Sequence, residues 1–235
     1  MKNRYLFISP DYPPPLVGGS LIYVHNLIEN SDLDFTVLTD KKNRTNDLKI
    51  RYIETKHIIN SSSPTKIQLL KMYSYIFFNL IKFRKYKVIV LNISAIGNGF
   101  FSYVMSKLNY KVVIVAFAEE ITLALKAKGL TGFLKRLALK GYKSANTIVS
   151  ISNFAKQILR EKVGVRSDIY VIPTPVHGSK IKYSKFEKKD NTSIFKILSV
   201  GRLIKRKGFD KLLIAFKGII EKGYNAELNI IGNGP

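Results

Sequence analysis

The chain has 235 residues, of which 46% are hydrophobic and 23% charged, a balance typical of globular proteins rather than of disordered or fibrous ones. Its 39 Lys and Arg against 16 Asp and Glu give a formal net charge of +23, which predicts attraction to anionic partners such as lipid headgroups, nucleic acids or phosphorylated ligands. Because the chain contains no cysteine, disulfide frameworks and thiolate metal sites are excluded.

The apolar segments bear on where the protein works. The first ten residues lack the long apolar core of a signal peptide. The most membrane-like run, residues 72–81, is too short to cross a bilayer. We therefore expect a cytoplasmic protein.

The first three quarters of the chain alternate short apolar runs with segments of helical periodicity. Strands are expected at residues 5–8, 35–38, 50–53, 88–91, 112–115 and 147–151. Helices are expected at residues 21–29, 66–86, 100–108 and 153–162, with two further helical pieces inside 121–143, broken at residues 129–132. This alternation predicts an α/β domain with a doubly wound parallel sheet.

A proline-rich loop follows the first strand and ends at Gly18 and Gly19, where a helix begins. Prolines do not continue a sheet, and glycines at a helix start let backbone N–H groups approach an anion. The pair therefore predicts a ligand-facing loop, with a flexible turn as the alternative. A Gly-x-Gly-x-x-Gly fingerprint is absent after this strand, which argues against an NAD-binding oxidoreductase.

Two basic amphipathic helices are expected, at residues 66–86 and within 121–143, where Phe133 and Leu134 share one side. Such helices are typical of membrane-surface elements, although a domain helix with a charged outer face has the same pattern. Together they favour contact with an anionic membrane surface. The apolar face of the first helix, which we assign to the core, comprises Ile67, Leu70, Ser74, Phe77, Phe78 and Ile81.

Acidic residues are scarce in the middle of the chain. Between residues 55 and 160 the only ones are Glu119 and Glu120, directly after an expected strand. The carboxyl end of a parallel strand is where ligands bind, so both are candidate site residues. The alternative is that they stabilise the next helix, since acidic residues favour the first turn.

Metal binding is not favoured by the acidic or histidine residues. Asp32 and Asp34 form an Asp-x-Asp pair, a pattern that can hold a divalent cation, but they precede a strand and are interpreted as a solvated turn. His25, His57 and His177 are scattered along the chain. We therefore expect no metal site.

The end of the chain repeats the strand–helix–strand pattern. A strand expected to be buried, at residues 195–200, leads into Gly201 and Arg202, and a basic loop closes at Lys207 before a helix at 209–221. A strand at 228–231 then runs into Gly-Asn-Gly-Pro. Because ligands sit at the carboxyl ends of such strands, Arg202 and Lys207 beside a glycine turn and a helix start predict a diphosphate cradle. The alternative is that both are ordinary solvated cations.

These motifs resemble the retaining GT-B glycosyltransferases of the glycosyltransferase family 4 type. The Pro-Pro-x-x-Gly-Gly loop is similar to the opening of that family, and residues 150–176 resemble the closing strand–helix–strand of its first domain. The residues that resemble its donor-binding half are Val200 to Leu203, Lys207, Gly208, Asp210, Leu213, Ala215, Phe216 and the Ile-Gly-Asn-Gly-Pro end.

The resemblance implies a role for each candidate residue. Arg202 and Lys207 would bind the diphosphate of a nucleotide sugar, Gly18 and Gly19 would lie in the cleft near the transferred sugar, and Glu119 would orient an acceptor hydroxyl. The family often has a histidine just before this acidic position, which is missing here. No nucleophile or base is assigned, and no cofactor is implied beyond the nucleotide diphosphate sugar that serves as donor.

The resemblance also implies a domain plan. We expect an N-terminal, acceptor-side Rossmann-like domain at residues 1–177, a linker at 178–193, and the start of a nucleotide-sugar-binding domain at 194–235. The last is far shorter than a typical domain of roughly 100–150 residues. We therefore expect an incomplete second domain and an inactive or impaired enzyme.

The implied function is transfer of a sugar to an acceptor hydroxyl with retention, in glycan, polysaccharide or lipid-linked saccharide synthesis. The acceptor would be a saccharide or a lipid-linked saccharide, and the protein would work in the cytoplasm or at the inner face of the membrane. Alternatives are a non-catalytic remnant that binds nucleotide sugars or a membrane surface, and a sugar-nucleotide epimerase. A nucleic-acid binder is disfavoured because no helix-turn-helix, zinc-finger or RNA-binding aromatic signature is present.

Overall fold

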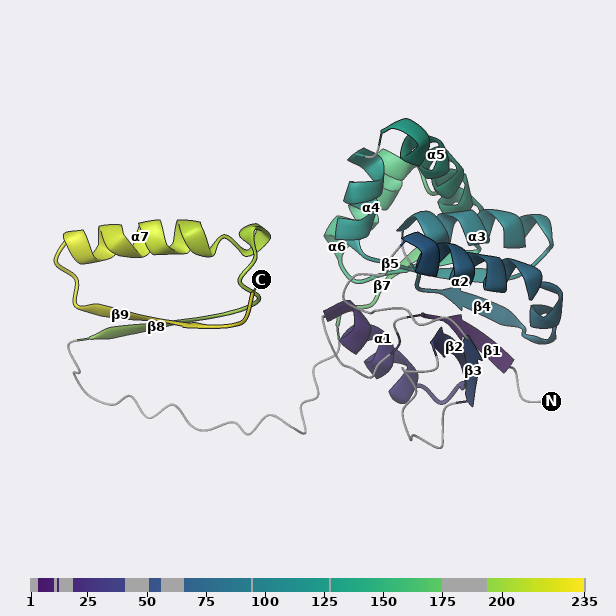
Figure 1. Ribbon diagram of the computed structural model, residues 1–235, viewed down its shortest axis with the longest axis horizontal. Helices are drawn as coiled ribbons and strands as arrows, with labels where there is room; N and C mark the ends of the chain where they lie inside the picture. The colour runs from purple at the N-terminus through teal and green to yellow at the C-terminus, as the bar shows by residue number, and fades with distance from the viewer. Residues whose placement is uncertain are drawn as a thin grey trace. The chain divides into compact units, whose positions relative to one another are not determined.

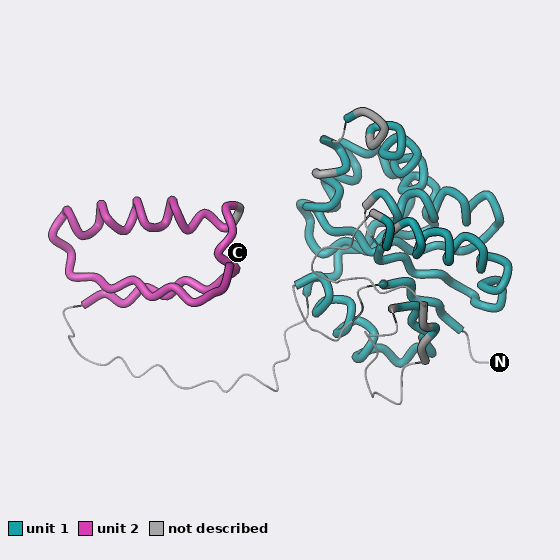
Figure 2. Tube along the Cα trace, in the orientation of Figure 1, with its two compact units in different colours: residues 1–177 teal, residues 178–235 magenta. Residues whose placement is uncertain are grey.

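The computed structural model describes residues 4–10, 12, 19–40, 51–55, 66–93, 95–126, 128–174 and 194–234. The chain divides into two compact units, residues 1–177 and 178–235 (Figure 2). The expected linker, residues 178–193, lies outside the described residues, as do His57 and His177.

Unit 1 is built on one sheet of seven strands in the order β3-β2-β1-β4-β5-β6-β7. Every neighbouring pair is parallel, and Tyr5 of β1 lies opposite both Phe35 of β2 and Val88 of β4. This is the strand order of a doubly wound Rossmann-type sheet, so the predicted fold class is confirmed. The strands are β1 (Arg4–Ile8), β2 (Asp34–Asp40), β3 (Arg51–Thr55), β4 (Val88–Leu91), β5 (Val112–Ala116), β6 (Thr147–Ser150) and β7 (Asp168–Val171).

Helices cover both faces of this sheet (Figure 1). A short 3-10 helix, η2 (Ile81–Lys85), follows α2, and a π-helical turn, η3 (Leu159–Val163), follows α6. The α-helices are α1 (Gly19–Glu29), α2 (Lys66–Phe78), α3 (Ala95–Lys107), α4 (Ala118–Lys126), α5 (Gly129–Ser144) and α6 (Asn153–Ile158).

The core of unit 1 lies on the two faces of the sheet, because successive residues of a strand point to opposite sides. Leu6 and Ile8 of β1 pack with Met72 of α2 and Phe101 of α3, whereas Phe7 packs in a second cluster on the side of α1. Alternate residues of the other central strands divide in the same way. The strands are apolar throughout because both faces are covered.

The helix expected at residues 66–86 is shorter than its pattern indicated. The carbonyl of Leu80 accepts hydrogen bonds from the Phe83 N–H at 2.9 Å and from the Tyr110 hydroxyl at 2.5 Å. The first of these is the tighter bond of a 3-10 turn, so α2 ends at Phe78 and η2 follows. Elsewhere α3 starts five residues before the expected position, and the break in residues 121–143 falls between α4 and α5, ahead of the expected glycines.

The assignment of this apolar face to the core is wrong. Ile67, Phe78 and Ile81 are 67%, 80% and 82% exposed, respectively. The helix instead buries Met72 and Ile76. Helix α2 has apolar side chains on more than one side, and contacts with the sheet and α3 decide which side is buried.

Unit 2 consists of two parallel strands, β8 (Phe195–Val200) and β9 (Ala226–Ile231), with α7 (Phe209–Glu221) and the 3-10 helix η5 (Lys205–Lys207) between them. The predicted strand–helix–strand pattern is confirmed. The expectation that the first strand is buried is wrong, since Phe195, Leu198 and Val200 are 63–70% exposed. One helix covers one face of a two-stranded sheet, which leaves the other face open in the described part of the unit.

Candidate functional site

The strand order of the unit 1 sheet reverses between β1 and β4. Open α/β sheets bind ligands at the carboxyl ends of the strands at such a point. Ser9 and Asn92 follow these two strands directly. The Asn92 side chain donates to the Ser9 hydroxyl at 3.1 Å, and the Asn92 N–H donates to the Ile8 carbonyl at 2.9 Å. These bonds tie together the ends of two strands that are far apart in sequence. They form a rigid polar edge at the carboxyl ends of β1 and β4.

Asn98 of α3 organises the next two loops. Its side-chain oxygen accepts a hydrogen bond from the Ile93 N–H at 2.8 Å, and its amide donates to the Val115 carbonyl at 3.3 Å. The side chain is fully buried, so it links the turn after β4 to the end of β5 from inside the protein. We did not predict this role from the sequence. The available signal was an asparagine between two glycines in an otherwise apolar helix.

Tyr142 of α5 is buried close to this polar cluster. Its hydroxyl has no hydrogen-bond partner of normal geometry among the described residues. Burial raises the pKa of Tyr142, the nearby charge of Glu120 raises it further, and the proximity of Asn98 opposes the shift. The phenol therefore stays neutral and places a polar atom next to the acidic start of α4.

Glu119 and Glu120 both lie in the first turn of α4, directly after β5. Glu119 is exposed and Glu120 is half-buried, and both interact with other groups of the protein. A carboxylate in the first turn is stabilised by the helix dipole, so the position suits the structural role. It is also at the carboxyl edge of the sheet, as an acceptor contact requires. Their role as an acceptor contact therefore stays a prediction.

Of the two predicted cleft glycines, Gly18 lies outside the described residues and Gly19 is the first residue of α1. A Cβ added at Gly19 would meet nothing within 4 Å. Open space at the start of α1 is compatible with approach of a ligand to the backbone. The assignment of this pair to the cleft stays a prediction.

A polar chain that we did not predict links Tyr12, near the start of the proline-rich loop, to α1. The Tyr12 hydroxyl and His25 Nδ1 are 3.1 Å apart, and His25 Nε2 lies 3.5 Å from a carboxylate oxygen of Glu29. Tyr12 is fully buried. Both ring nitrogens of His25 therefore have partners, and the side chain has a structural role in linking Tyr12 to α1.

In unit 2 the two motifs of the donor-side resemblance pack against each other. Gly201 N–H donates to the Ile231 carbonyl and Leu203 N–H to the Asn233 carbonyl, each at 2.9 Å. A Cβ added at Gly232 would overlap the Gly201 carbonyl oxygen, and one added at Gly234 would overlap Leu203. The glycines of the Gly-Asn-Gly turn are therefore required by close approach of two backbones.

Arg202 and Lys207 both follow the carboxyl end of β8, and both side chains are exposed. Lys207 ends η5, and Gly208, with a φ of 70°, turns the chain into α7. This left-handed conformation favours glycine. The structure thus brings both cations to one edge of the unit 2 sheet, and their role in diphosphate binding stays a prediction.

In the described part of the chain, no group of three or more His, Asp and Glu residues lies close enough together to hold a metal ion. Of the helices described, none combines the length and the apolar character needed to cross a bilayer.

No family model matches the chain. The chain is 26% identical over 248 residues to the capsular polysaccharide biosynthesis glycosyltransferase CapM of Staphylococcus aureus, covering 99% of this chain and 62% of CapM. It therefore spans less than two thirds of the length of that curated relative.

Solved structures share the fold at low sequence identity. Sucrose-phosphate synthase from Thermosynechococcus elongatus matches with a TM-score of 0.66 and 17% identity, over 98% of this chain and 62% of that chain. Arabidopsis thaliana UGT89C1, complexed with UDP-L-rhamnose, matches with a TM-score of 0.52 and 12% identity, over 98% of this chain and 69% of that chain. The chain has a GT-B glycosyltransferase fold. In this GT-B fold the sheet edges that carry Ser9 and Asn92 in unit 1, and Arg202 and Lys207 in unit 2, are the candidate ligand-binding edges.

Proposed function

We propose that this protein is a glycosyltransferase that transfers a sugar from a nucleotide diphosphate sugar to an acceptor hydroxyl in the synthesis of a capsular or other polysaccharide. The observation that carries the proposal is the similarity to CapM along 99% of the chain, which includes both the unit 1 sheet and the Gly-Arg and Gly-Asn-Gly turns of unit 2. The GT-B fold supports it.

The donor diphosphate would bind at the carboxyl edge of the unit 2 sheet. Arg202 and Lys207 supply fixed positive charge there, and Arg in particular matches phosphate oxygens with paired N–H donors. Positive charge held beside the departing diphosphate stabilises the transition state of glycosyl transfer. We propose retention of configuration, with attack on the leaving-group face, because that path needs no side chain as nucleophile or base.

The acceptor would bind at the carboxyl edge of the unit 1 sheet, near Ser9, Asn92 and Glu119. We propose a saccharide or lipid-linked saccharide acceptor and a location in the cytoplasm or at the inner face of the membrane. The bonds of Asn92 and Asn98 hold this edge rigid, which is what positioning of an acceptor hydroxyl requires. In this arrangement Glu119 orients the hydroxyl.

The donor assignment is tested by titrating UDP into the isotope-labelled chain and following backbone amide shifts by NMR, which detects weak binding. We expect the largest shifts at Gly201, Arg202 and Gly208. Arg202→Ala and Lys207→Ala should each weaken binding about tenfold or more, because hydrogen bonds to charged groups contribute about 1.5–3 kcal/mol.

Lys217→Ala is the matched control for these two variants. Lys217 is exposed on α7 and lies 3.5 Å from Glu221, so the substitution removes one positive charge from the same unit. UDP affinity should not change in this variant. Equal affinity of all the variants and the parent would remove Arg202 and Lys207 from the donor site.

The stereochemical proposal has a separate test. The anomeric configuration of the first product of transfer from a UDP-sugar can be assigned by proton NMR, and we expect the configuration of the donor. UDP binding with no transfer to any saccharide or lipid-linked acceptor would favour a non-catalytic nucleotide-sugar-binding protein instead.

A further inference from the structure

The exposed side of α2 and η2 carries an unusual density of large apolar side chains. We call this set the apolar ridge. Its members are all at least half exposed, although Phe77 and Phe78 also pack against each other with ring centroids 5.9 Å apart. Isolated exposed apolar residues are common, but a contiguous set marks an interaction surface. The ridge comprises Ile67, Leu70, Phe77, Phe78 and Ile81.

The ridge is not a displaced part of the core. The opposite side of α2 already supplies Met72 and Ile76 to the main core cluster, and both are fully buried. A shallow cavity of about 420 Å³ lies along the outer side of the helix between Leu70 and Phe78. The helix therefore has two apolar sides, one packed on the sheet and one that no other described element covers.

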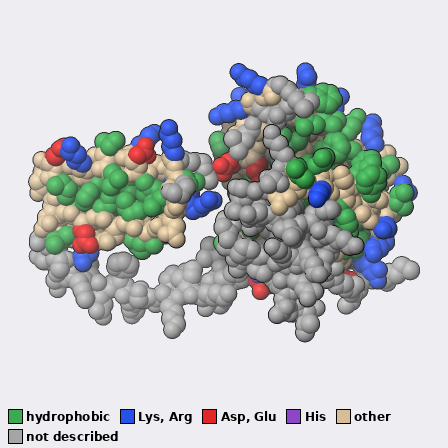
Figure 3. Space-filling model, in the orientation of Figure 1, with side chains coloured by type: hydrophobic (Ala, Val, Ile, Leu, Met, Phe, Trp, Pro, Cys, Tyr) green, Lys and Arg blue, Asp and Glu red, His purple; other side chains and the backbone are tan. Residues whose placement is uncertain are grey.

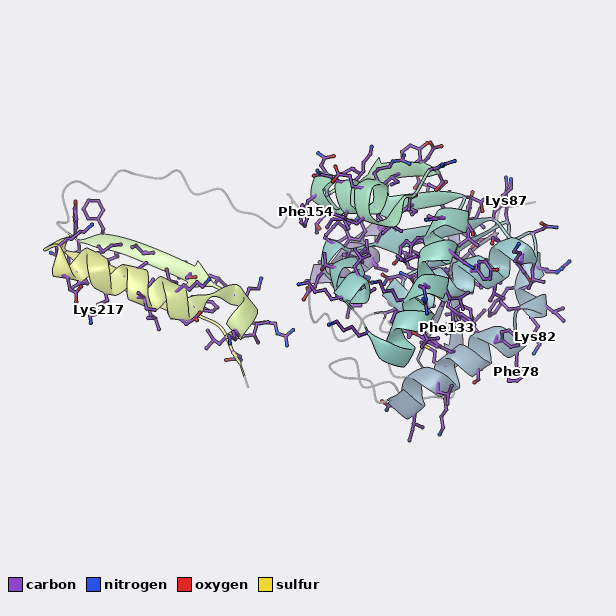
Figure 4. The ribbon with its side chains drawn as sticks, turned by 90° about the horizontal axis from the view of Figure 1, so that it is seen from above. Phe78, Lys82, Lys87, Phe133, Phe154 and Lys217 are labelled. Atoms are coloured by element: carbon purple, nitrogen blue, oxygen red, sulfur yellow. The ribbon has the colours of Figure 1, made fainter. Side chains whose placement is uncertain are left out.

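Basic side chains surround the ridge. Lys71, Lys82 and Lys85 are exposed on α2 and η2. Figure 4 shows Lys82 near Phe78 at the end of α2. The sequence has no acidic residue from residue 56 to residue 118, so this whole segment is purely cationic. A partner for the ridge must accept apolar side chains and be negatively charged.

A basic cavity of about 370 Å³ begins at Arg84 of η2, the helix that also carries Ile81, and is lined by Lys87 and Lys111 together with Tyr110. The Tyr110 hydroxyl donates to the Leu80 carbonyl at 2.5 Å, and the Arg84 guanidinium lies over the Tyr110 ring at 5.9 Å. The wall of the cavity is thus fixed to the last turn before η2. Its three cations suit a phosphate group next to apolar chains.

Helices α3 and α5 pack beside α2 in the same layer, and α5 also carries an exposed aromatic side chain. Tyr73 of α2 packs on Phe101 of α3 with ring centroids 5.5 Å apart, and the Ser102 hydroxyl of α3 donates to the Gly141 carbonyl of α5 at 2.9 Å. Phe133, 57% exposed, projects from α5 (Figure 4). Figure 3 shows apolar side chains gathered over this layer, with Lys and Arg at its margin.

We propose that the apolar ridge and the basic cavity at η2 dock the protein on an anionic phospholipid bilayer. Phe78 and Ile81 enter the boundary between headgroups and acyl chains, the lysines contact the anionic surface, and the basic cavity takes a lipid phosphate. This extends the proposed location at a membrane by naming the surface that binds it. Docking needs no nucleotide, so it can be tested apart from sugar transfer.

The charge and apolar character of this surface argue against two other partners, a second copy of the chain and a nucleic acid. A second copy of the chain would place the same lysines and arginines opposite one another across a two-fold interface. Nucleic acid matches the charge but has no counterpart for the aliphatic side chains of Ile67, Leu70 and Ile81. A bilayer with anionic lipids satisfies both the apolar and the charged part.

The test is sedimentation of the chain, without nucleotide, with vesicles of equal parts phosphatidylglycerol and phosphatidylcholine, and with vesicles of phosphatidylcholine alone. We expect strong partition into the first and weak partition into the second. Phe78→Ser should lower partition roughly tenfold, because the buried area of a large apolar side chain is lost. Lys82→Gln should lower it about fivefold, the contribution of one lysine at an anionic surface.

Matched control variants distinguish binding through this surface from general electrostatic attraction of a strongly basic chain to anionic vesicles. Phe154→Ser removes a phenylalanine that is 63% exposed on α6, at the other end of unit 1 from Phe78 (Figure 4). Lys162→Gln removes an exposed lysine of η3. Both should leave partition unchanged. Equal losses in matched variants would overturn the proposal in favour of unspecific electrostatic binding.

Two further outcomes would also overturn it. If Phe78→Ser converts a dimer to a monomer in analytical ultracentrifugation without changing vesicle partition, the ridge binds a second copy. If inorganic phosphate abolishes partition and Phe78→Ser does not weaken it, the basic cavity is a site for soluble anions. Because UDP titration uses no vesicles, failure of docking and failure of the proposed donor site are distinguishable.

Discussion

Tyr23 of α1 shows how burial of a single polar atom sets local energetics. The residue is fully buried and its ring packs edge-on against Phe117, 5.8 Å between centroids, next to the carboxyl edge of β5. Its hydroxyl has no hydrogen-bond partner among the described residues. Burial raises the pKa of Tyr23 to about 12. A buried hydroxyl without a partner costs free energy that an apolar side chain does not.

Tyr23→Phe should therefore be neutral or stabilising at neutral pH, by up to about 1 kcal/mol in the free energy of unfolding. The pH dependence follows from the raised pKa. The unfolded chain ionises this phenol near its ordinary pKa of about 10, whereas the folded protein holds it neutral up to about 12, so stability is retained below about pH 10 and falls as the pH rises toward about 12.

Urea unfolding at neutral pH and at several pH values above about 10 measures both effects of Tyr23→Phe. The variant should lose less stability on the alkaline side than the parent, with the remaining loss due in part to Tyr142. Tyr170→Phe, which alters an exposed ring on β7, is the control and should follow the parent. An equal alkaline loss in Tyr23→Phe and the parent would contradict the assignment.

At this scale the sequence indicated candidate residues but not their contacts. The structure places Arg202 and Lys207 at one sheet edge, where the local pattern of strand, glycine and helix start put them. The bond from Asn92 to Ser9 joins residues 83 positions apart, and the Asn98 side chain of α3 donates to the Val115 carbonyl of β5. No local pattern contains such pairings, because they exist only once strands from distant parts of the chain are neighbours.

The crossing of α3 and α5 is the tightest helix contact in the described part of unit 1. A Cβ added at Gly141 would overlap the Gly99 carbonyl oxygen, and one added at Gly99 would overlap the backbone of Ala138. The Ser102 hydroxyl closes the contact by donating to the Gly141 carbonyl. Small residues on both helices let the backbones touch, which positions Asn98 one residue before the crossing.

Gly141→Ala should destabilise unit 1 by about 2 kcal/mol or more, because overpacking a rigid contact outweighs the gain of about 1 kcal/mol in helix propensity. Gly218→Ala on α7 is the control, since a Cβ there would meet nothing within 4 Å. It should leave unfolding of unit 1 unchanged. Thermal unfolding followed by circular dichroism measures the difference, and an unchanged midpoint in Gly141→Ala would mean that the helices can separate at little cost.

The expected core face of α2 illustrates the limit of prediction at the scale of the element. Helical periodicity predicted one helix over residues 66–86, of which α2 covers residues 66–78. Phe78 and Ile81 were assigned to the core and are 80% and 82% exposed. Apolar residues on several sides of a helix leave its orientation undetermined. The side with Met72 and Ile76 packs against the sheet and α3, and the other apolar side stays exposed as the apolar ridge.

The two units differ in how much they bury. Unit 1 has many fully buried side chains on both faces of its sheet, whereas none of the described residues of unit 2 is buried. A few tens of residues bury too small a share of their surface to be strongly stable alone. The free energy of local opening should accordingly be much lower in β8 and β9 than in the centre of unit 1.

Native-state hydrogen exchange with mass spectrometry tests this difference. We expect amides of β8 and β9 to exchange orders of magnitude faster than those of Ile89, Leu91 and Ile114 in the central strands. UDP should slow exchange in unit 2 if it binds there, since a ligand that binds only the folded form stabilises it. Equal protection of β8 and β5 would show that unit 2 is stabilised by contacts beyond its own two strands and helix.

The sequence by itself determined the order and type of the elements, the parallel α/β class, the glycine turns after β8 and β9, and the basic character of residues 56–118. These follow from local periodicity, turn chemistry and charge, which neighbouring residues set. Only the tertiary structure decided which side of α2 faces solvent, that Asn92 and Asn98 fasten the carboxyl edge, and that Gly141 lies against α3. Those outcomes depend on which distant segments become neighbours in space, because burial and hydrogen bonding are satisfied across the sheet rather than along the chain.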